Sequence, residues 1–409
     1  MGMRSYAGYQ EQGVPEEYLS STAPRAFNCE LRQKVVQSQT GTIGASSRMV
    51  FSIPTGENSF LRGGTAYISC LVSITKTADA VVTWRKSRLG NATIRACQLT
   101  ANGVLVSRLD QADDVNALMY CHAGSQQYYA NDATVMEGGI GMSAVGNADS
   151  IQLFIPVPLG ILNSSSIPLF ALPNNNLLLE IETNTIANMF KTDNVNNSVS
   201  AVTFANCQLI YESIQVDASF VRMLKDEMAK ANAPWIIPYS ETRCFAQSGG
   251  DKSIVLGLNL SSVDAVFVQN YANPADTTSQ TSYIAPSANA GSNKFDVLCD
   301  GVRVNQYLRD EGIKFFPDMN LALSKLYDVA CVSTSYGSAL TRANYLAGAF
   351  AGGQNLRKSY SKSTVLNGRP VNSLQLDLAG FAEANLVISV FHTSLCQIDP
   401  ATGVVTLIR

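Results

Sequence analysis

The chain has 409 residues, of which 46% are hydrophobic and 15% charged, and its formal net charge at pH 7 is -3. This hydrophobic content excludes wholesale disorder, and the length allows two domains, or three small ones, each with its own core. The weak negative charge and the absence of a Lys or Arg run argue against sequence-specific nucleic-acid binding. The charged fraction lies below the roughly 25% of ordinary domains, which indicates much uncharged surface of the kind that subunit interfaces bury.

The first 28 residues show no hydrophobic periodicity and are predicted to form an extended arm, with a plain disordered tail as the alternative. The arm lacks the apolar core of a signal peptide, and Tyr6 stands where a myristoylation pattern needs Ser or Thr. The longest apolar stretch, 153–173, is interrupted by prolines and polar residues and cannot form a membrane-spanning helix. We therefore expect neither secretion nor membrane insertion.

Strands dominate the first half of the predicted structure. Residues 66–74 alternate between apolar and polar side chains, which is typical of a half-buried strand, and residues 177–182 repeat the pattern. Residues 99–106 predict a hairpin around Asn102-Gly103, followed by a helix-like segment at 115–120. A long segment without strand pattern, rich in Gly, Ala, Ser and Asn, covers 138–150.

One clear helix divides the two strand-rich halves. Residues 218–232 carry an apolar stripe among charged residues, and Pro234 ends the pattern. The second half predicts strands at 254–260, 374–378 and 386–391, each with alternating side chains. Its turns are Asp300-Gly301, within a hairpin at 295–304, and Asn367-Gly368. Residues 271–293 and 333–363 are predicted to be long loops without strands, either functional or mere decoration.

The two halves repeat one motif. A hairpin with an Asn-Gly or Asp-Gly turn is followed by a helix-like segment, at 115–120 in the first half and at 319–327 in the second. A duplicated β domain explains the repeat, although hairpins are common enough to recur by chance. With roughly eight strands in each half, the expected architecture is a sandwich or jelly roll.

The nine cysteines are widely spaced and include no C-x-x-C pair. Because most of them lie in apolar, strand-like runs, we interpret them as buried free thiols rather than a disulfide framework. This interpretation favours a chain that folds in a reducing compartment.

The sequence predicts no catalytic residue, metal ligand or cofactor site. The two histidines, His122 and His392, have no partners at metal-ligand spacing and are expected to be structural. The glycine-rich segments 138–141 and 348–353 lack the strand, helix and lysine of a phosphate-binding loop. Paired carboxylates such as Asp113-Asp114 and Asp310-Glu311 are typical of solvated surface.

Residues 152–182 carry a distinctive pattern. Ile155-Pro156-Val157-Pro158 ends one predicted strand, and Leu172-Pro173 precedes another that contains Leu179-Glu180-Ile181. Prolines withhold backbone donors and therefore belong at strand ends and in the connection between strands. The segment resembles the double jelly-roll major capsid proteins of double-stranded DNA viruses, of the adenovirus-like, polinton-like and virophage-like lineage. Segments 295–305, 365–370, 384–397 and 403–408 resemble the C-terminal jelly roll of its small-virus members.

The resemblance implies an all-β fold of two tandem eight-stranded antiparallel jelly rolls with short inserted helices. We expect an N-terminal arm at 1–28, a first jelly roll at 29–216, a linker helix at 217–238 and a second jelly roll at 239–409. The implied function is that of a major capsid protein, whose homotrimers form pseudo-hexagonal capsomers that tile an icosahedral shell. The expected location is the virion, after synthesis and assembly inside the host cell.

The implied partners are other copies of the chain, together with penton and minor capsid or cement proteins; contact with an inner membrane stays open. We expect the interfaces to involve the arm, the long loops and the linker helix. The residues chosen to represent these surfaces are Tyr6, Tyr9, Tyr18, Val221, Leu224, Met228, Tyr271, Tyr283 and Tyr336.

Three alternatives remain. A jelly-roll protein that binds glycans or receptors would carry an aromatic and acidic pocket on its loops. A two-jelly-roll enzyme that acts on glycans would need acidic residues that converge between the domains. A minor capsid or vertex protein of the same lineage usually has one jelly roll, which the chain length and the repeated hairpin disfavour.

Overall fold

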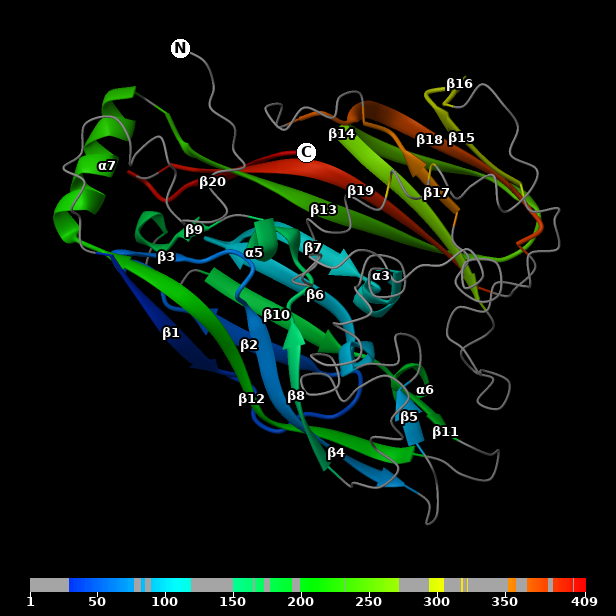
Figure 1. Ribbon diagram of the computed structural model, residues 1–409, viewed down its shortest axis with the longest axis horizontal. Helices are drawn as coiled ribbons and strands as arrows, with labels where there is room; N and C mark the ends of the chain where they lie inside the picture. The colour runs from blue at the N-terminus through cyan, green and yellow to red at the C-terminus, as the bar shows by residue number, and fades with distance from the viewer. Residues whose placement is uncertain are drawn as a thin grey trace.

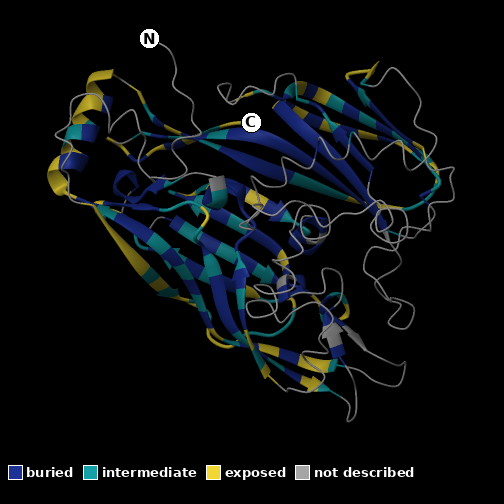
Figure 2. Cartoon of the chain, viewed as in Figure 1, coloured by how far each residue is buried: buried dark blue, intermediate teal, exposed yellow. Residues whose placement is uncertain are grey.

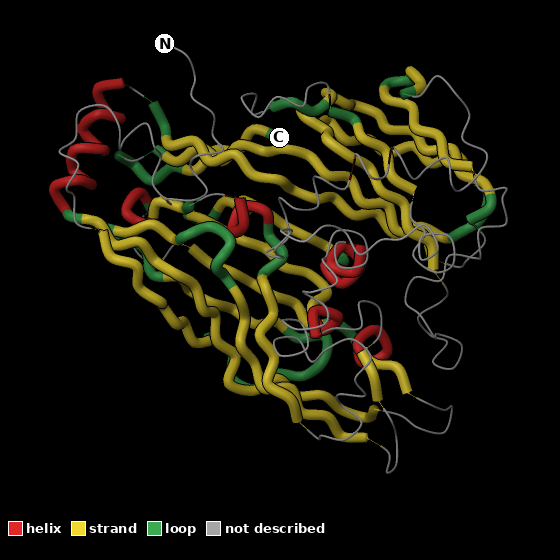
Figure 3. Tube along the Cα trace, in the orientation of Figure 1, coloured by secondary structure: helices red, strands yellow, loops and turns green. Residues whose placement is uncertain are grey.

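The computed structural model describes residues 29–76, 82–84, 90–118, 150–164, 166–172, 177–192, 199–231, 233–271, 294–304, 318, 322, 352–357, 366–381, 385–399 and 401–409. Antiparallel strands make up most of this part of the chain, and short helices connect them (Figures 1 and 3). The predicted arm lies outside the described residues, as do nearly all residues of the predicted loops 138–150 and 271–293.

The first half forms two sheets, each named here for its central strand. The β12 sheet has the order β8-β4-β12-β3-β9, with β1 also paired to β12, and the β10 sheet has the order β2-β10-β6-β7. A separate ribbon pairs β5 with β11. The strands are β1 (Cys29–Gln37), β2 (Arg48–Ile53), β3 (Ser59–Leu61), β4 (Tyr67–Lys76), β5 (Val82–Trp84), β6 (Ile94–Ala101), β7 (Val104–Asp110), β8 (Ser150–Pro156), β9 (Ile167–Pro168), β10 (Leu177–Thr183), β11 (Phe190–Thr192) and β12 (Val199–Val216).

Short helices fill the ends of these sheets. The predicted helix at 115–120 begins earlier, as α3 (Ala112–Leu118), with Asp113 and Asp114 in its first turn, where the positive end of the helix dipole stabilises carboxylates. Both aspartates are buried, so the expectation that this pair lies on solvated surface is wrong. The others are α5 (Gly160–Ser164), α6 (Ile186–Met189), η2 (Gly90–Thr93) and η5 (Leu169–Ala171).

The second half forms one continuous sheet that folds into two layers. The strand order is β13-β19-β14-β18-β15-β16, with β17 paired to β14 and β20 to β19. The strands are β13 (Trp235–Ser248), β14 (Lys252–Tyr271), β15 (Lys294–Cys299), β16 (Val302–Arg303), β17 (Gly352–Asn355), β18 (Arg369–Ala379), β19 (Asn385–Ile398) and β20 (Val405–Ile408). The start of β14 pairs with β18 and its end with β19, and the register shifts between Gly257 and Val263. One irregular strand therefore joins the layers, which we call the β18 sheet and the β19 sheet.

The two halves have the same topology. The order β1-β12-β4-β8 corresponds to β13-β19-β14-β17, and β2-β10-β6-β7 corresponds to β14-β18-β15-β16. The repeated hairpins occupy equivalent positions, and their turns have the same left-handed backbone, with φ of 48° and 77° at Asn102 and Gly103 and 50° and 79° at Asp300 and Gly301. The fold is therefore the predicted double jelly roll.

Burial explains most of the strand predictions. Along β4, Ile68, Cys70 and Val72 are buried, and along β10 the buried residues alternate from Leu177 to Thr183. The predicted alternation at 386–391 is wrong, because β19 lies between β13 and β14 and is buried on both faces. Figure 2 shows this buried band across the second half.

Two turn and loop predictions are also corrected. Asn367 and Gly368 do not adopt positive φ. A Cβ at Gly368 would lie 2.6 Å from Ser262 Oγ and from the Val263 carbonyl, so the glycine is needed for close packing instead. The segment 333–363 is not free of strands, since it contains β17. The predicted helix at 319–327 lies outside the described residues except for Ala322.

The helix between the halves is confirmed as α7 (Ala218–Ala231). Phe220, Val221, Leu224 and Met228 are buried on one face, as the apolar stripe predicts. On its other side the helix carries charged residues, and Lys225 places its ammonium group 5.8 Å from the centre of the Phe170 ring. The helix thus closes one end of the molecule, at the left in Figure 1.

Candidate functional site: the seam between the jelly rolls

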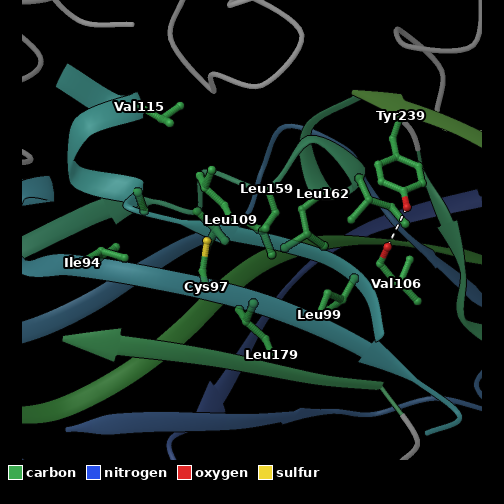
Figure 4. Close-up of a cluster of buried hydrophobic side chains, with 14 of the residues drawn as sticks. Ile94, Cys97, Leu99, Val106, Leu109, Val115, Leu159, Leu162, Leu179 and Tyr239 are labelled. Carbon is green, nitrogen blue, oxygen red and sulfur yellow. Dashed lines mark hydrogen bonds between the residues drawn. The ribbon is translucent and has the colours of Figure 1, made fainter. Parts of the chain in front are cut away.

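The free edge of β7 is where the first jelly roll meets the second. Among the described strands, β7 pairs with β6 alone, so its other edge presents unpaired backbone groups. Tyr239 of β13 donates its hydroxyl to the Val106 carbonyl at 2.6 Å. Figure 4 shows the Tyr239 ring pointing toward Val106, beside the buried cluster that includes Leu99, Leu159 and Leu162. A side chain of the second jelly roll thus satisfies a backbone group of the first.

Two charged residues extend this contact. Arg409 donates from one guanidinium nitrogen to the carbonyls of Val106 at 3.2 Å and Leu105 at 3.4 Å. Its Nε lies 3.3 Å from Glu241 Oε2. The Glu241 carboxylate also accepts a hydrogen bond from the backbone N–H of Arg108. Backbone groups of Leu105, Val106 and Arg108 in β7 are therefore held by a tyrosine, an arginine and a glutamate from the second jelly roll.

Behind this edge lies a buried polar cluster. Ser394 donates to Glu241 Oε2 at 3.0 Å, and its Oγ lies 3.2 Å from His392 Nδ1. His392 is completely buried, with Nε2 3.7 Å from Glu241 Oε2. Burial lowers the pKa of His392 to about 3, and the nearby positive charges of Arg243 and Arg409 act in the same direction. The imidazole is therefore neutral at physiological pH.

Burial has the opposite effect on the carboxyl group of Glu241. Its pKa is raised by burial, while Arg409, the Ser394 hydroxyl and the Arg108 N–H favour the ionised form. A buried carboxylate is tolerated only where such partners replace its lost hydration. The partners come from β7, β13 and β19 and from the residue that follows β20, so the cluster links both jelly rolls.

The seam is tightly packed beyond the polar cluster. A Cβ at Gly160, the first residue of α5, would lie 1.8 Å from the Ser240 carbonyl oxygen, so only glycine fits against β13. At the α7 end, the Trp235 ring lies 5.7 Å from the ring of Phe60 and 6.1 Å from that of Phe170. These contacts join the two jelly rolls into one continuous hydrophobic core.

The sequence-predicted interface residues have different locations. Tyr6, Tyr9, Tyr18, Tyr283 and Tyr336 lie outside the described residues, and Tyr271 is the last residue of β14.

The three residues chosen from the linker helix face inward. Val221 and Met228 are 4% exposed and Leu224 is fully buried, all within the core of this chain. An interface on α7 stays a prediction, and it would have to use the charged side of the helix.

The main seam residues, Tyr239, Glu241 and Arg409, were missed by sequence reasoning. One signal was available: Glu241 and Arg243 are the two charged residues of the strand Trp235–Ser248, and charged residues are rarely buried unless they have partners.

The described cysteines agree with their interpretation as free, mostly buried thiols. All seven described cysteines are free, and five of them are buried. Burial raises the pKa of Cys207 to about 11 and that of Cys396 to about 12, which makes these thiols unreactive. Within the described ranges no group of three or more His, Cys, Asp or Glu residues could hold a metal ion. The described helices are all too short or too polar to span a bilayer.

No protein-family model and no curated protein sequence matches the chain. Its structure, however, is similar to solved structures over nearly its full length. VP54 of PBCV-1, fitted into a reconstruction of the virophage Sputnik, has a TM-score of 0.61 at 11% identity, covering 96% of this chain and 99% of that one. The Faustovirus major capsid protein has a TM-score of 0.59 at 8% identity, covering 92% of this chain and 91% of that one. A chain of the Sputnik virophage has a TM-score of 0.53 at 12% identity, covering 96% of this chain and 92% of that one. The likeness shows that the chain has the double jelly-roll fold of these proteins.

Proposed function

We propose that the chain is a major capsid protein, a structural subunit rather than an enzyme. Three copies would form a pseudo-hexagonal capsomer, and capsomers would tile an icosahedral shell. The observation that carries the proposal is the match of both jelly rolls together, over more than nine tenths of this chain, to a protein that is itself a major capsid protein. The low charged fraction supports it, because interface cores are depleted of charge.

The seam supports this function physically. A trimer with six jelly rolls approximates a hexagon only if the two jelly rolls of each chain keep a fixed angle. Hydrogen bonds from Tyr239 and Arg409 to the Val106 carbonyl, together with the close approach of Gly160 to Ser240, restrain that angle. Directional contacts of this kind specify one arrangement, whereas apolar packing alone tolerates sliding.

The proposed organisation has an arm at 1–28, a first jelly roll at 29–216, a linker with α7 at 217–238 and a second jelly roll at 239–409. It is supported by the strand pairing, since every described strand up to β12 pairs within the first half and every one from β13 onward pairs within the second. The proposed location is the virion, after synthesis in a host cell. The proposed further partners are penton and minor capsid or cement proteins.

The solution mass of the purified chain tests the proposal. Light scattering on a sizing column should give three times the chain mass of 43.9 kDa. Such a species should be stable on dilution, because obligate interfaces bury large areas. Negative-stain images of it should then show a hexagonal outline. A monomer over a wide concentration range would contradict the capsomer, and saturable glycan binding by that monomer would favour a receptor-binding protein.

A further inference from the structure

The strand β20 extends the β19 sheet beyond the point where another strand leaves it. β14 pairs with β19 from Asn385 to His392. β20 takes over at Leu395 and pairs with β19 up to Ile398. The strands β13, β19, β14, β18 and β15 pair with one another without β20. The pairing of the second sandwich therefore does not explain why β20 is there.

β20 is fastened to the first jelly roll at both of its ends. Before the strand, the Gly403 carbonyl accepts a hydrogen bond from Asn102 Nδ2 at 3.0 Å, and Asn102 lies in the turn that leads into β7. After the strand, Arg409 donates to the Val106 carbonyl at 3.2 Å and contacts the Glu241 carboxylate. β20 thus follows the first half of β7 across the seam.

The turn that presents β20 is held by local contacts. The Asp399 carboxylate accepts hydrogen bonds from the Ala401 N–H at 2.9 Å and from the Thr402 hydroxyl at 2.6 Å. The backbone of Asp399 is bonded to Val404 and Gly403. β20 therefore belongs to a short hairpin that a few contacts join to the first jelly roll. Such a hairpin can detach at a lower free-energy cost than unfolding of either sandwich.

We propose that β20 is a latch, which closes the seam as one cooperative unit with the edge of β7 and the start of β13. In the open state Tyr239 and Arg409 would no longer cover the Val106 carbonyl, and each jelly roll would keep its own sandwich. The jelly rolls could then change their angle about the linker that contains α7. The latch belongs to the single chain, so it does not depend on the proposed function.

Cys396 lies beneath the latch. It is 1% exposed and stands in line with Leu407 of β20 and Ile237 of β13. The residues two positions from Ile237 on the same face of β13, Trp235 and Tyr239, both contact the first jelly roll. Cys396 is therefore shielded by β20 and by the first jelly roll, and a thiol reagent reaches it when the latch opens.

Three further thiols distinguish the kinds of opening. Cys244 lies on β13, and its thiol is within electrostatic range of Asp110 at the other end of β7, beyond the contacts of β20. Burial raises the pKa of Cys244, so its thiol is unreactive while the seam is closed. Cys70 of β4 is 1% exposed in the core of the first sandwich and reports global unfolding. The exposed Cys29 gives the unhindered labelling rate.

Labelling of the native chain with N-ethylmaleimide, followed site by site by mass spectrometry, tests the latch. Arg409→Ala removes one attachment and should raise the labelling rates of Cys396 and Cys244 by the same factor, about 10- to 100-fold. The rate at Cys70 should not change, because the sandwiches stay folded. Acceleration of Cys396 alone would mean that β20 frays by itself, and equal acceleration of all three thiols would mean global unfolding. Either result would overturn the latch, as would unchanged rates.

A milder pair of variants covers the case in which Arg409→Ala fails to fold. Asn102→Gly removes the amide that binds Gly403, while glycine suits the φ of 48° and keeps the turn. It should accelerate the two seam thiols together, by about 2- to 10-fold. The matched control is Asp300→Gly, the equivalent turn of the second jelly roll, where φ is 50° and the side chain accepts hydrogen bonds from β18. It should leave both rates as in wild type, and equal effects of the two variants would overturn the latch.

Discussion

His392 makes the seam sensitive to acid, and replacing it with asparagine tests this directly. The folded chain keeps the imidazole neutral, since burial beside two arginines lowers its pKa to about 3. The unfolded chain binds a proton near the ordinary pKa of about 6.5. Unfolding therefore takes up a proton below that pH, and the free energy of unfolding falls as the pH falls from 6.5 toward 3.

The size of the effect follows from the two pKa values. Linkage between a folded-state pKa of about 3 and an unfolded one of about 6.5 removes about 2 kcal/mol of stability between pH 7 and pH 5. No discount for solvent applies, because the side chain is 0% exposed. Glu241 acts in the opposite direction: its raised pKa means that the folded state takes up a proton first as the pH falls. The pH dependence of the wild-type unfolding free energy is therefore the sum of two opposing effects, from His392 and from Glu241.

The comparison between wild type and His392→Asn isolates the histidine. Urea unfolding at several pH values can be followed through the fluorescence of the two buried tryptophans, Trp84 and Trp235. The difference in unfolding free energy between the two proteins should change by about 2 kcal/mol between pH 7 and pH 5. The variant His122→Asn shows how much of the pH dependence of the unfolding free energy comes from the other histidine. If the unfolding free energies of wild type and His392→Asn changed with pH in the same way, the interpretation of His392 as buried and neutral would be refuted. An imidazole NMR signal that titrates near pH 6.5 and disappears in His392→Asn would refute it independently.

Two further substitutions test the packing of the seam. Gly160→Ala should lower the free energy of unfolding by roughly 1–3 kcal/mol, because a Cβ cannot lie 1.8 Å from the Ser240 carbonyl, although alanine otherwise favours a helix. Gly41→Ala, with no atom within 4 Å of its Cβ, is the control, and an equal effect in both variants would contradict the packing argument. Tyr239→Phe should cost about 1–3 kcal/mol, since the buried Val106 carbonyl loses its short hydrogen bond; a neutral result would mean that Arg409 alone satisfies that carbonyl.

Local chemistry determined which parts of the fold were predictable. The hairpin turns at Asn102-Gly103 and Asp300-Gly301 need positive φ, and Asn-Gly and Asp-Gly are the residue pairs that favour it, so the sequence indicates these turns directly. Alternation predicted β4 and β10, which have one face inward and one partly exposed. The same rule failed for β19, because a central strand that packs on both faces has no reason to alternate. Gly368 was predicted to be a turn residue. A glycine is needed there because Ser262, more than one hundred residues earlier, leaves no room for a Cβ.

The seam could not be predicted for a related reason. Its polar contacts join residues near positions 106, 241, 392 and 409, and no local pattern links them.

Composition nevertheless carried information about where the charges would lie. A chain with 15% charged residues cannot cover every surface with charge. Three ion pairs lie on the outer face of the β10 sheet, whereas the outer faces of β12 and β19 are nearly free of charge. The outer face of the β19 sheet is buried by the first jelly roll, so at the seam the missing charge coincides with a surface that is removed from water.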